Sequence, residues 1–170
     1  MMISGIVLVL SFFLDGILSN FLPYMVGDLS LFTPMFTVVS LVIVYPFFKK
    51  KLKNYFISCF ILGLVYDFVY TNLLFYNAIL FLAIGILVIF LYRYIRLTWI
   101  SLILFVVVAI SGYECLNAIV IIAFQLVPMT FYRLLYKISH SILLNICYAE
   151  LVYFIIWLLP MRYKKVAINS

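Results

Sequence analysis

Long stretches of mainly apolar residues run through this sequence, and each is about as long as a bilayer is thick. A helix rises about 1.5 Å per residue, so roughly 20 apolar residues cross the about 30 Å of a bilayer core. Hydrophobic residues make up 69% of the chain and charged residues only 9%, which leaves too little polar surface for a water-soluble globule. We therefore predict an all-α polytopic membrane protein, a single domain over 1–170. Its transmembrane helices, about six, are expected at 3–22, 31–48, 54–73, 76–92, 97–127 and 138–160.

Basic residues are clustered between these stretches. If the N-terminus is cytoplasmic, the cytoplasmic segments Lys49–Lys53, Arg93–Arg96 and Arg162–Lys165 hold nine of the eleven Lys and Arg residues. Such residues accumulate in the cytoplasmic loops of membrane proteins. The asymmetry predicts an even number of spans in a cytoplasmic membrane, with both termini inside. It also explains the net charge of +6 without a nucleic-acid partner.

The fifth stretch is too long for a simple crossing. As one helix it would reach about 46 Å, against a bilayer core of about 30 Å. We expect a bend near Gly112. Between Pro128 and Ser139, aromatic and aliphatic residues alternate with Arg133 and Lys137. This pattern predicts an amphipathic helix on the outer surface of the membrane, with a plain loop as the alternative.

Four acidic residues lie inside the predicted spans, namely Asp15, Asp67, Glu114 and Glu150. An ionisable side chain at bilayer depth costs about 2.5 to 3.5 kcal/mol, so such residues are paired, hydrated or functional. Counting along the helices from the cytoplasmic side places Asp15, Asp67 and Glu114 in the outer half of the membrane. We expect these three carboxyls to face a polar crevice that opens outward. Alternatively, each carboxyl caps a helix end or meets headgroup water.

Other residues are candidates for contacts in this crevice or between helices. Arg133, Lys137 or His140 could pair with the carboxyls. Gly63 lies four residues before the acid of the third span, on the same helix face, where its small size lets a neighbouring backbone come close. Asn145 could donate and accept hydrogen bonds across helices.

The sequence offers little for catalysis or metal binding. It contains one histidine, and its three cysteines are widely separated, without the spacing of metal ligands. The motifs GxxxxGKS/T, HExxH and GxSxG are absent from the sequence. We therefore expect no enzyme, no cofactor and no metal site.

The order of several short segments resembles that of a known family. FILGLVYDFVYTNLL (Phe60–Leu74) looks like the Gly- and Asp-bearing stretch of that family's third helix, and TPMF (Thr33–Phe36) looks like the start of its second. YECLN (Tyr113–Asn117) supplies a Glu in the fifth span. HSILLN (His140–Asn145) resembles the opening of the last span, before a Pro-x-Arg and Lys-rich segment at Pro160–Lys165. Over nearly its full length the chain thus resembles MreD, a small membrane subunit of the bacterial machinery for cell elongation.

Two departures from the family pattern are visible. Asp15 stands where relatives often carry Glu or Gln. The glycine that commonly follows the Asp67 segment is missing, and Phe75, Tyr76 and Asn77 stand there instead. These departures weaken residue-level comparison in the loop after the third span.

The resemblance implies a non-catalytic scaffold in the bacterial cytoplasmic membrane. Such a scaffold binds MreC, a protein with one membrane span and a large extracytoplasmic part, and helps control cell shape and peptidoglycan synthesis. Further implied partners are MreB, RodA, a class B penicillin-binding protein and membrane lipids. The six-helix arrangement also resembles the substrate-binding subunits of energy-coupling-factor transporters. The alternative function is therefore binding of a small solute, such as a vitamin.

Overall fold

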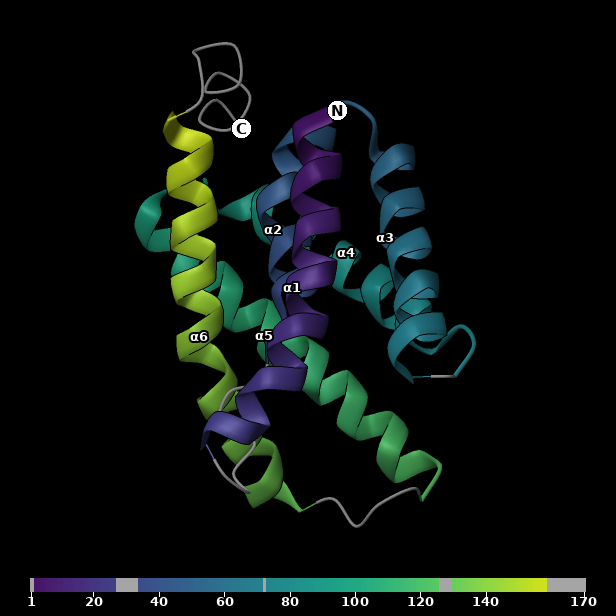
Figure 1. The fold of residues 1–170 in the computed structure, drawn as a ribbon. Coiled ribbons are helices and arrows are strands. Elements are labelled where there is room, and N and C mark those ends of the chain that lie inside the picture. Colours follow the sequence, from purple (N-terminus) through teal and green to yellow (C-terminus); the bar gives the residue numbers. More distant parts are fainter. Residues whose placement is uncertain (1, 27–33, 72, 126–129, 159–170) are drawn as a thin grey trace.

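The computed structural model describes residues 2–26, 34–71, 73–125 and 130–158, and over these ranges the chain is an all-helical bundle without strands (Figure 1). The six α-helices are α1 (Met2–Val26), α2 (Phe36–Phe48), α3 (Leu52–Tyr66), α4 (Tyr76–Tyr94), α5 (Trp99–Ala123) and α6 (Phe131–Leu158). A short π-helical segment, Asp67–Thr71, extends α3.

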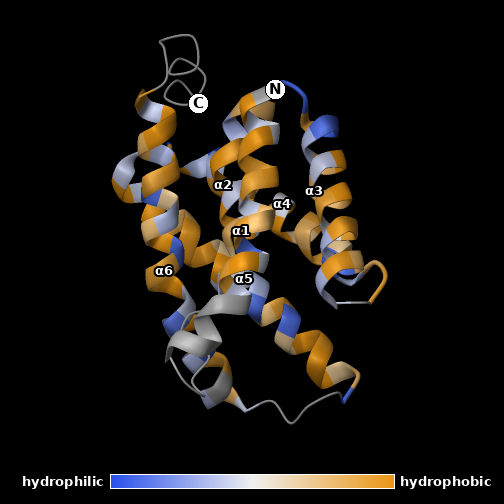
Figure 2. Cartoon of the chain, viewed as in Figure 1, coloured by the Kyte–Doolittle hydropathy of each residue, from blue (hydrophilic) through white to orange (hydrophobic). Residues whose placement is uncertain are grey.

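Helix length and composition fit a bilayer. Four segments are long and apolar enough to cross one, namely Leu52–Thr71, Tyr76–Tyr94, Trp99–Ala123 and Leu134–Leu158. Ile3–Ser19 and Phe36–Phe48 are shorter apolar helices. Apolar residues dominate the labelled helices, whereas the connection from α2 to α3 is hydrophilic (Figure 2). The prediction of an all-α membrane protein is therefore confirmed.

The outside of the bundle is apolar, as its core is. Large apolar side chains point outward, as Ile79, Ile86 and Phe90 do along α4. In contrast, ten polar or charged residues are buried, namely Ser4, Ser11, Asp15, Thr37, Ser40, Asp67, Asn77, Glu114, Ser141 and Asn145. A contiguous apolar surface of this kind marks a lipid or protein interface. The polar side chains therefore hold the helices together from inside.

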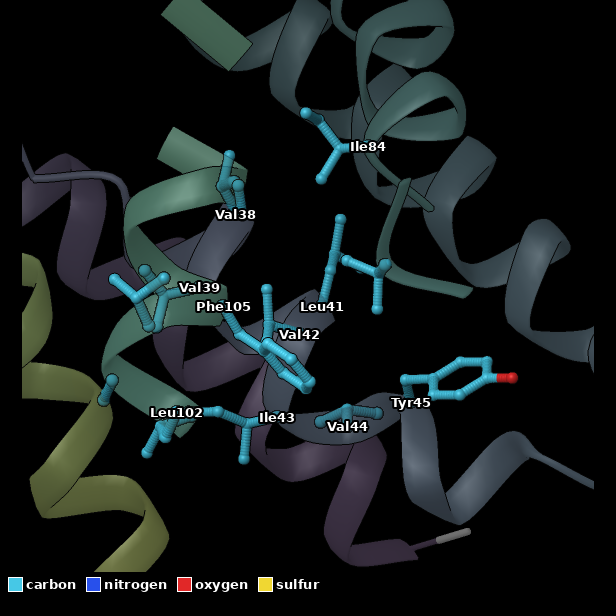
Figure 3. Close-up of a cluster of buried hydrophobic side chains, with 14 of the residues drawn as sticks. Val38, Val39, Leu41, Val42, Ile43, Val44, Tyr45, Ile84, Leu102 and Phe105 are labelled. Carbon is cyan, nitrogen blue, oxygen red and sulfur yellow. The ribbon is translucent and has the colours of Figure 1, made fainter. Parts of the chain in front are cut away.

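Helix α2 is the centre of the bundle. It packs against each of the other five helices, and apart from Phe47 its residues are buried. Its side chains fill the core shown in Figure 3, where Ile84 of α4 and Leu102 and Phe105 of α5 approach it. Two tyrosine hydroxyls from neighbouring helices donate to α2 carbonyls, Tyr55 to Leu41 at 3.1 Å and Tyr92 to Val42 at 3.0 Å.

The helices alternate in direction, so their ends form two groups (Figure 1). The basic end carries Lys49–Lys53 between α2 and α3 and Arg93–Arg96 between α4 and α5. The start of α1 and the end of α6 lie at this same end, at the top of Figure 1. We call the other end the opposite end. The third basic cluster expected from the sequence, Arg162–Lys165, lies outside the described residues.

The second helix starts later than expected. The sequence predicts a span over 31–48, but α2 begins at Phe36, just after Pro34. Pro34 and Met35, which come directly before the helix, are not helical. With 13 residues, α2 is about 20 Å long, shorter than the about 30 Å core of a bilayer. Its first turn therefore lies inside the protein.

The path from Gly112 to Ser139 also differs from expectation. Helix α5 continues through Gly112 and ends at Ala123, before the predicted end at 127. The bend expected near Gly112 stays a prediction. The separate surface helix expected between Pro128 and Ser139 is not formed by the described residues. Instead, Arg133 and Lys137 belong to the first turns of α6, which continues to Leu158. Packing of α5 against α6 favours one continuous helix over a surface segment.

The turn into α4 contains a residue in the left-handed backbone region. Phe75 has φ 66° and ψ 0°. A residue with a Cβ pays about 1 kcal/mol or more there, whereas glycine does not. The free energy of unfolding of Phe75→Gly should therefore be about 1 kcal/mol higher than that of Phe75→Ala. Both variants lose the phenyl ring, but only glycine removes the strain. Thermal unfolding in detergent, followed by circular dichroism, compares the two variants. Equal midpoints would contradict the strain at this turn.

Candidate functional site

Asp15 of α1 caps the amino terminus of the central helix. Its carboxylate accepts hydrogen bonds from the Phe36 backbone N–H at 2.6 Å, the Thr37 backbone N–H at 2.9 Å and the Thr37 hydroxyl at 2.5 Å. The first N–H groups of a helix lack partners within it, and their aligned dipoles attract negative charge. Asp15 is 2% exposed, so water could not replace it as acceptor. This is the capping alternative left open by the sequence.

Helix α6 holds the same helix start from the other side. The side-chain oxygen of Asn145 accepts a hydrogen bond from the Met35 backbone N–H at 2.9 Å, and its NH₂ group donates to the Ser141 carbonyl at 2.7 Å. The ring of Tyr148 stacks on Phe36 with 4.1 Å between centroids. Asn145 thus accepts a hydrogen bond from the residue before α2, whereas the bond that it donates to Ser141 stays within α6.

Asp67, directly after α3, caps the amino terminus of α4 in the same way. Its carboxylate accepts hydrogen bonds from the Asn77 backbone N–H at 2.8 Å, the Asn77 side-chain NH₂ at 2.9 Å and the Ala78 backbone N–H at 3.3 Å. These N–H groups form the first turn of α4. The hydroxyl of Thr71 donates to the same carboxylate at 3.1 Å. A buried aspartate of one helix thus caps the following helix in both pairs.

Gly63 permits the close approach that this second cap needs. A Cβ at this position would stand 2.6 Å from the backbone nitrogen of Ala78 and 2.7 Å from the carbonyl oxygen of Asn77, and it would also overlap the Cα of Ala78. These atoms belong to backbone, which cannot turn away. The expectation that a neighbouring backbone packs on the Gly63 face agrees with this geometry.

A cavity of about 370 Å³ lies at the opposite end of the bundle, between the two caps. Residues from all six helices and from the π-helical segment line it, including Asp15, Met35, Thr71, Tyr76, Glu114 and Lys137. Asp67 is not among the lining residues of the cavity. Thr71, whose hydroxyl donates to Asp67, and Tyr76 do line it. Of the three carboxyls expected to share a crevice, Asp15 and Glu114 line this cavity and Asp67 does not.

Glu114 is the carboxyl in this cavity that the fold leaves incompletely bonded. The residue is 2% exposed, and its Oε2 has no hydrogen-bond partner among the described residues. Asn117, one turn further along α5, hydrogen-bonds the Glu114 side chain, and the charge of Lys137 acts on it across the cavity. A buried polar atom without a partner is unfavourable by about 1 to 3 kcal/mol. Glu114 therefore has acceptor capacity to offer to a ligand or partner.

Two further candidates, His140 and Glu150, are not among the described residues that line the cavity. His140 contacts its own helix, with Nδ1 2.8 Å from the Tyr136 carbonyl and the two rings packed at 3.9 Å. Arg133 belongs to α6, but its side chain is outside the described part of the structure. Glu150 of α6 has a buried oxygen, Oε1, without a hydrogen-bond partner among the described residues, yet it does not line the cavity.

Tyrosines on the cavity wall are the feature that sequence reasoning missed. Tyr66 of α3 and Tyr70 of the π-helical segment, four residues apart, line it, and Tyr113 lines it from α5. The Tyr113 hydroxyl donates to the Asn77 side-chain oxygen at 2.7 Å, and the Tyr76 hydroxyl donates to the Asn117 side-chain oxygen. The sequence signal was the four-residue spacing of Tyr66 and Tyr70, which places these two rings on one helix face.

The exposed apolar side chains, the long apolar helices and the polar contacts between them define a polytopic helical membrane protein. The family model of the rod shape-determining protein MreD matches residues 2–163, so this chain belongs to the MreD family of shape-determining membrane proteins. No curated protein and no solved structure matches the chain. The resemblance seen in the sequence is thereby confirmed, while the likeness to transporter subunits is not.

Removing the Asp15 cap tests its role. Asp15→Ala leaves two backbone N–H groups and one hydroxyl without their acceptor, and each buried unsatisfied group costs about 1 to 3 kcal/mol. We expect a clearly lower unfolding midpoint in detergent. The unfolding midpoint of Asp15→Asn, which keeps one acceptor oxygen, should lie between those of the unmodified protein and Asp15→Ala. Ser19→Ala, at an exposed position on the same helix, should have little effect on the midpoint. Unchanged stability of Asp15→Ala would refute the cap.

Gly63→Ala tests the helix contact. The added methyl group must push α3 away from the α4 backbone, and overpacking of this kind costs about 1 to 3 kcal/mol. The matched control is Gly5→Ala, because nothing lies within 4 Å of a Cβ at Gly5. Circular dichroism melts of both variants should show a loss for Gly63→Ala alone. Similar midpoints for the two variants would argue against close packing at Gly63.

Proposed function

We propose that this protein is a non-catalytic membrane scaffold that binds MreC and so helps control cell shape and peptidoglycan synthesis during elongation. Membership in a family of rod shape-determining membrane proteins supports this role. Through MreC the scaffold would work with MreB filaments, RodA and a class B penicillin-binding protein. No catalytic step is assigned to the chain.

The proposed orientation puts the basic end in the cytoplasm. Lys and Arg concentrate there, as they do in the cytoplasmic loops of membrane proteins. Both termini are then cytoplasmic in the bacterial cytoplasmic membrane. The cavity between the two caps opens on the extracytoplasmic side, where the large part of MreC lies.

The unbonded carboxyl oxygen of Glu114 is the observation that carries this proposal. Glu114 lines a cavity that is also lined by tyrosines, which offer apolar area together with hydroxyl groups. A basic, hydroxyl or N–H group from MreC would complete the hydrogen bonding of Glu114. Lys137 also lines the cavity, so a partner segment with a hydrogen-bond acceptor for its ammonium group is favoured.

A small-solute binding subunit is the second candidate, and the size of the cavity favours it. About 370 Å³ is within the range of pockets that hold small ligands, roughly 300 to 1,000 Å³. Under this alternative the purified protein should carry a stoichiometric small molecule without MreC. Native mass spectrometry of the protein released from detergent would detect that molecule.

Glu114→Gln tests the scaffold. The substitution keeps the size of the side chain but replaces a charge-assisted hydrogen bond, worth about 1.5 to 3 kcal/mol, with a neutral one. We expect the affinity for co-expressed MreC to fall by about tenfold or more, measured by co-purification in detergent and by microscale thermophoresis.

Glu150→Gln is the matched control, because Glu150 also has an unbonded buried oxygen but lies outside the cavity. This variant should bind MreC like the unmodified protein. Equal MreC binding by both variants, each with an unchanged unfolding midpoint, would exclude the cavity as the docking site.

A further inference from the structure

A second pocket, of about 520 Å³, lies at the basic end of the bundle. Its lining includes three cations, Lys49, Arg93 and Arg96, together with Tyr45, Tyr92 and Tyr94. No Asp or Glu is among the described residues that line it. The scaffold role proposed above uses the opposite end and leaves this pocket without a function.

Firm contacts hold the walls of this pocket in place. The rings of Tyr45 and Tyr92 pack with 4.8 Å between centroids, and the Tyr92 hydroxyl donates to the Val42 carbonyl at 3.0 Å. The linker with Arg96 is held by the first turn of α5, where the Ser101 hydroxyl donates to the Arg96 carbonyl at 2.7 Å. The cations therefore project from ordered backbone.

The charge balance of the pocket favours an anion. Lys49 follows the last residue of α2, and Arg93 lies in the last turn of α4. Each helix carboxyl terminus contributes about half a negative charge. The two arginines alone carry two full positive charges against these two partial charges, so a net positive charge of about +1 remains for a ligand even without a contribution from Lys49.

The surroundings of the pocket favour a lipid over a soluble anion. Ile86, Phe90 and Tyr94 form one outward stripe along α4, and they are 61%, 60% and 68% exposed. The stripe ends beside the pocket, because Tyr94 is itself a lining residue. An acyl chain can lie along Ile86 and Phe90 while the headgroup reaches Arg93 and Arg96. Basic pockets between transmembrane helices bind anionic headgroups in this manner.

We propose that this pocket is a binding site for the phosphate headgroup of an anionic phospholipid, with Lys49, Arg93 and Arg96 as its ligands. The planar guanidinium groups of the two arginines donate hydrogen bonds to the phosphate oxygens, and the ammonium group of the lysine adds a positive charge. The acyl chains extend along the α4 stripe. This site is independent of the proposed binding of MreC.

The experiment measures lipid binding to the full chain, purified in neutral detergent and stripped of lipid, by native mass spectrometry. Phosphatidylglycerol should bind about tenfold or more tightly than phosphatidylcholine. In Lys49→Gln/Arg93→Gln/Arg96→Gln this preference should disappear. The matched control Lys50→Gln/Lys51→Gln/Lys53→Gln removes three charges from the same end, outside the pocket, and should keep the preference.

Several outcomes would overturn the proposal. Equal binding of the two lipids by the unmodified protein would do so, as would equal loss of preference in both triple variants. Inorganic phosphate that binds as tightly as phosphatidylglycerol would identify the ligand as a free phosphate and exclude the lipid. If the pocket variant does not fold, the unmodified protein still decides the question. Its preference for phosphatidylglycerol must then weaken as NaCl is raised, and a salt-independent preference would count against the three cations.

Discussion

The bond between the Asp15 carboxylate and the start of α2 is the constraint on which the rest of the bundle depends. Helix α2 contacts all five other helices, yet it is too short to reach both faces of a bilayer. Its first N–H groups are therefore buried, and a membrane provides no water to satisfy them. Asp15 from α1 and Asn145 from α6 supply the acceptors. One helix start thus fixes the positions of three helices.

The same physical solution at Asp67 explains why polar residues gather at one end of the molecule. Both capped helices start at the opposite end, so both aspartates and their partners lie there. The side chains around these caps enclose a cavity instead of a dry apolar core. Glu114 differs from the two aspartates, because it caps no helix and retains an oxygen without a partner. In this region, the two aspartates therefore have a structural role, and Glu114 is the candidate for binding.

The sequence predicted some of these features because their signals are local. Gly63 and Asp67 are one turn apart, so their shared helix face followed from helical spacing alone. In contrast, the Asp15 cap joins residues 21 positions apart, and the Met35 contact of Asn145 spans 110 positions. No local pattern records such pairs. The late start of α2 and the merging of the Arg133–Lys137 segment into α6 were missed for the same reason, since packing decided both.

By itself, the sequence determined the solvent of this protein, because long apolar stretches separated by basic clusters can be buried only in lipid. It also determined the helical class and the family. The tertiary structure alone decided which carboxyls cap helices and which one faces a cavity, since this depends on the neighbours each carboxyl meets. It likewise decided that Lys49, Arg93 and Arg96 converge on one pocket, whereas the adjacent lysines do not. Helix packing brings together the ends of α2 and α4, and chain order does not encode that contact.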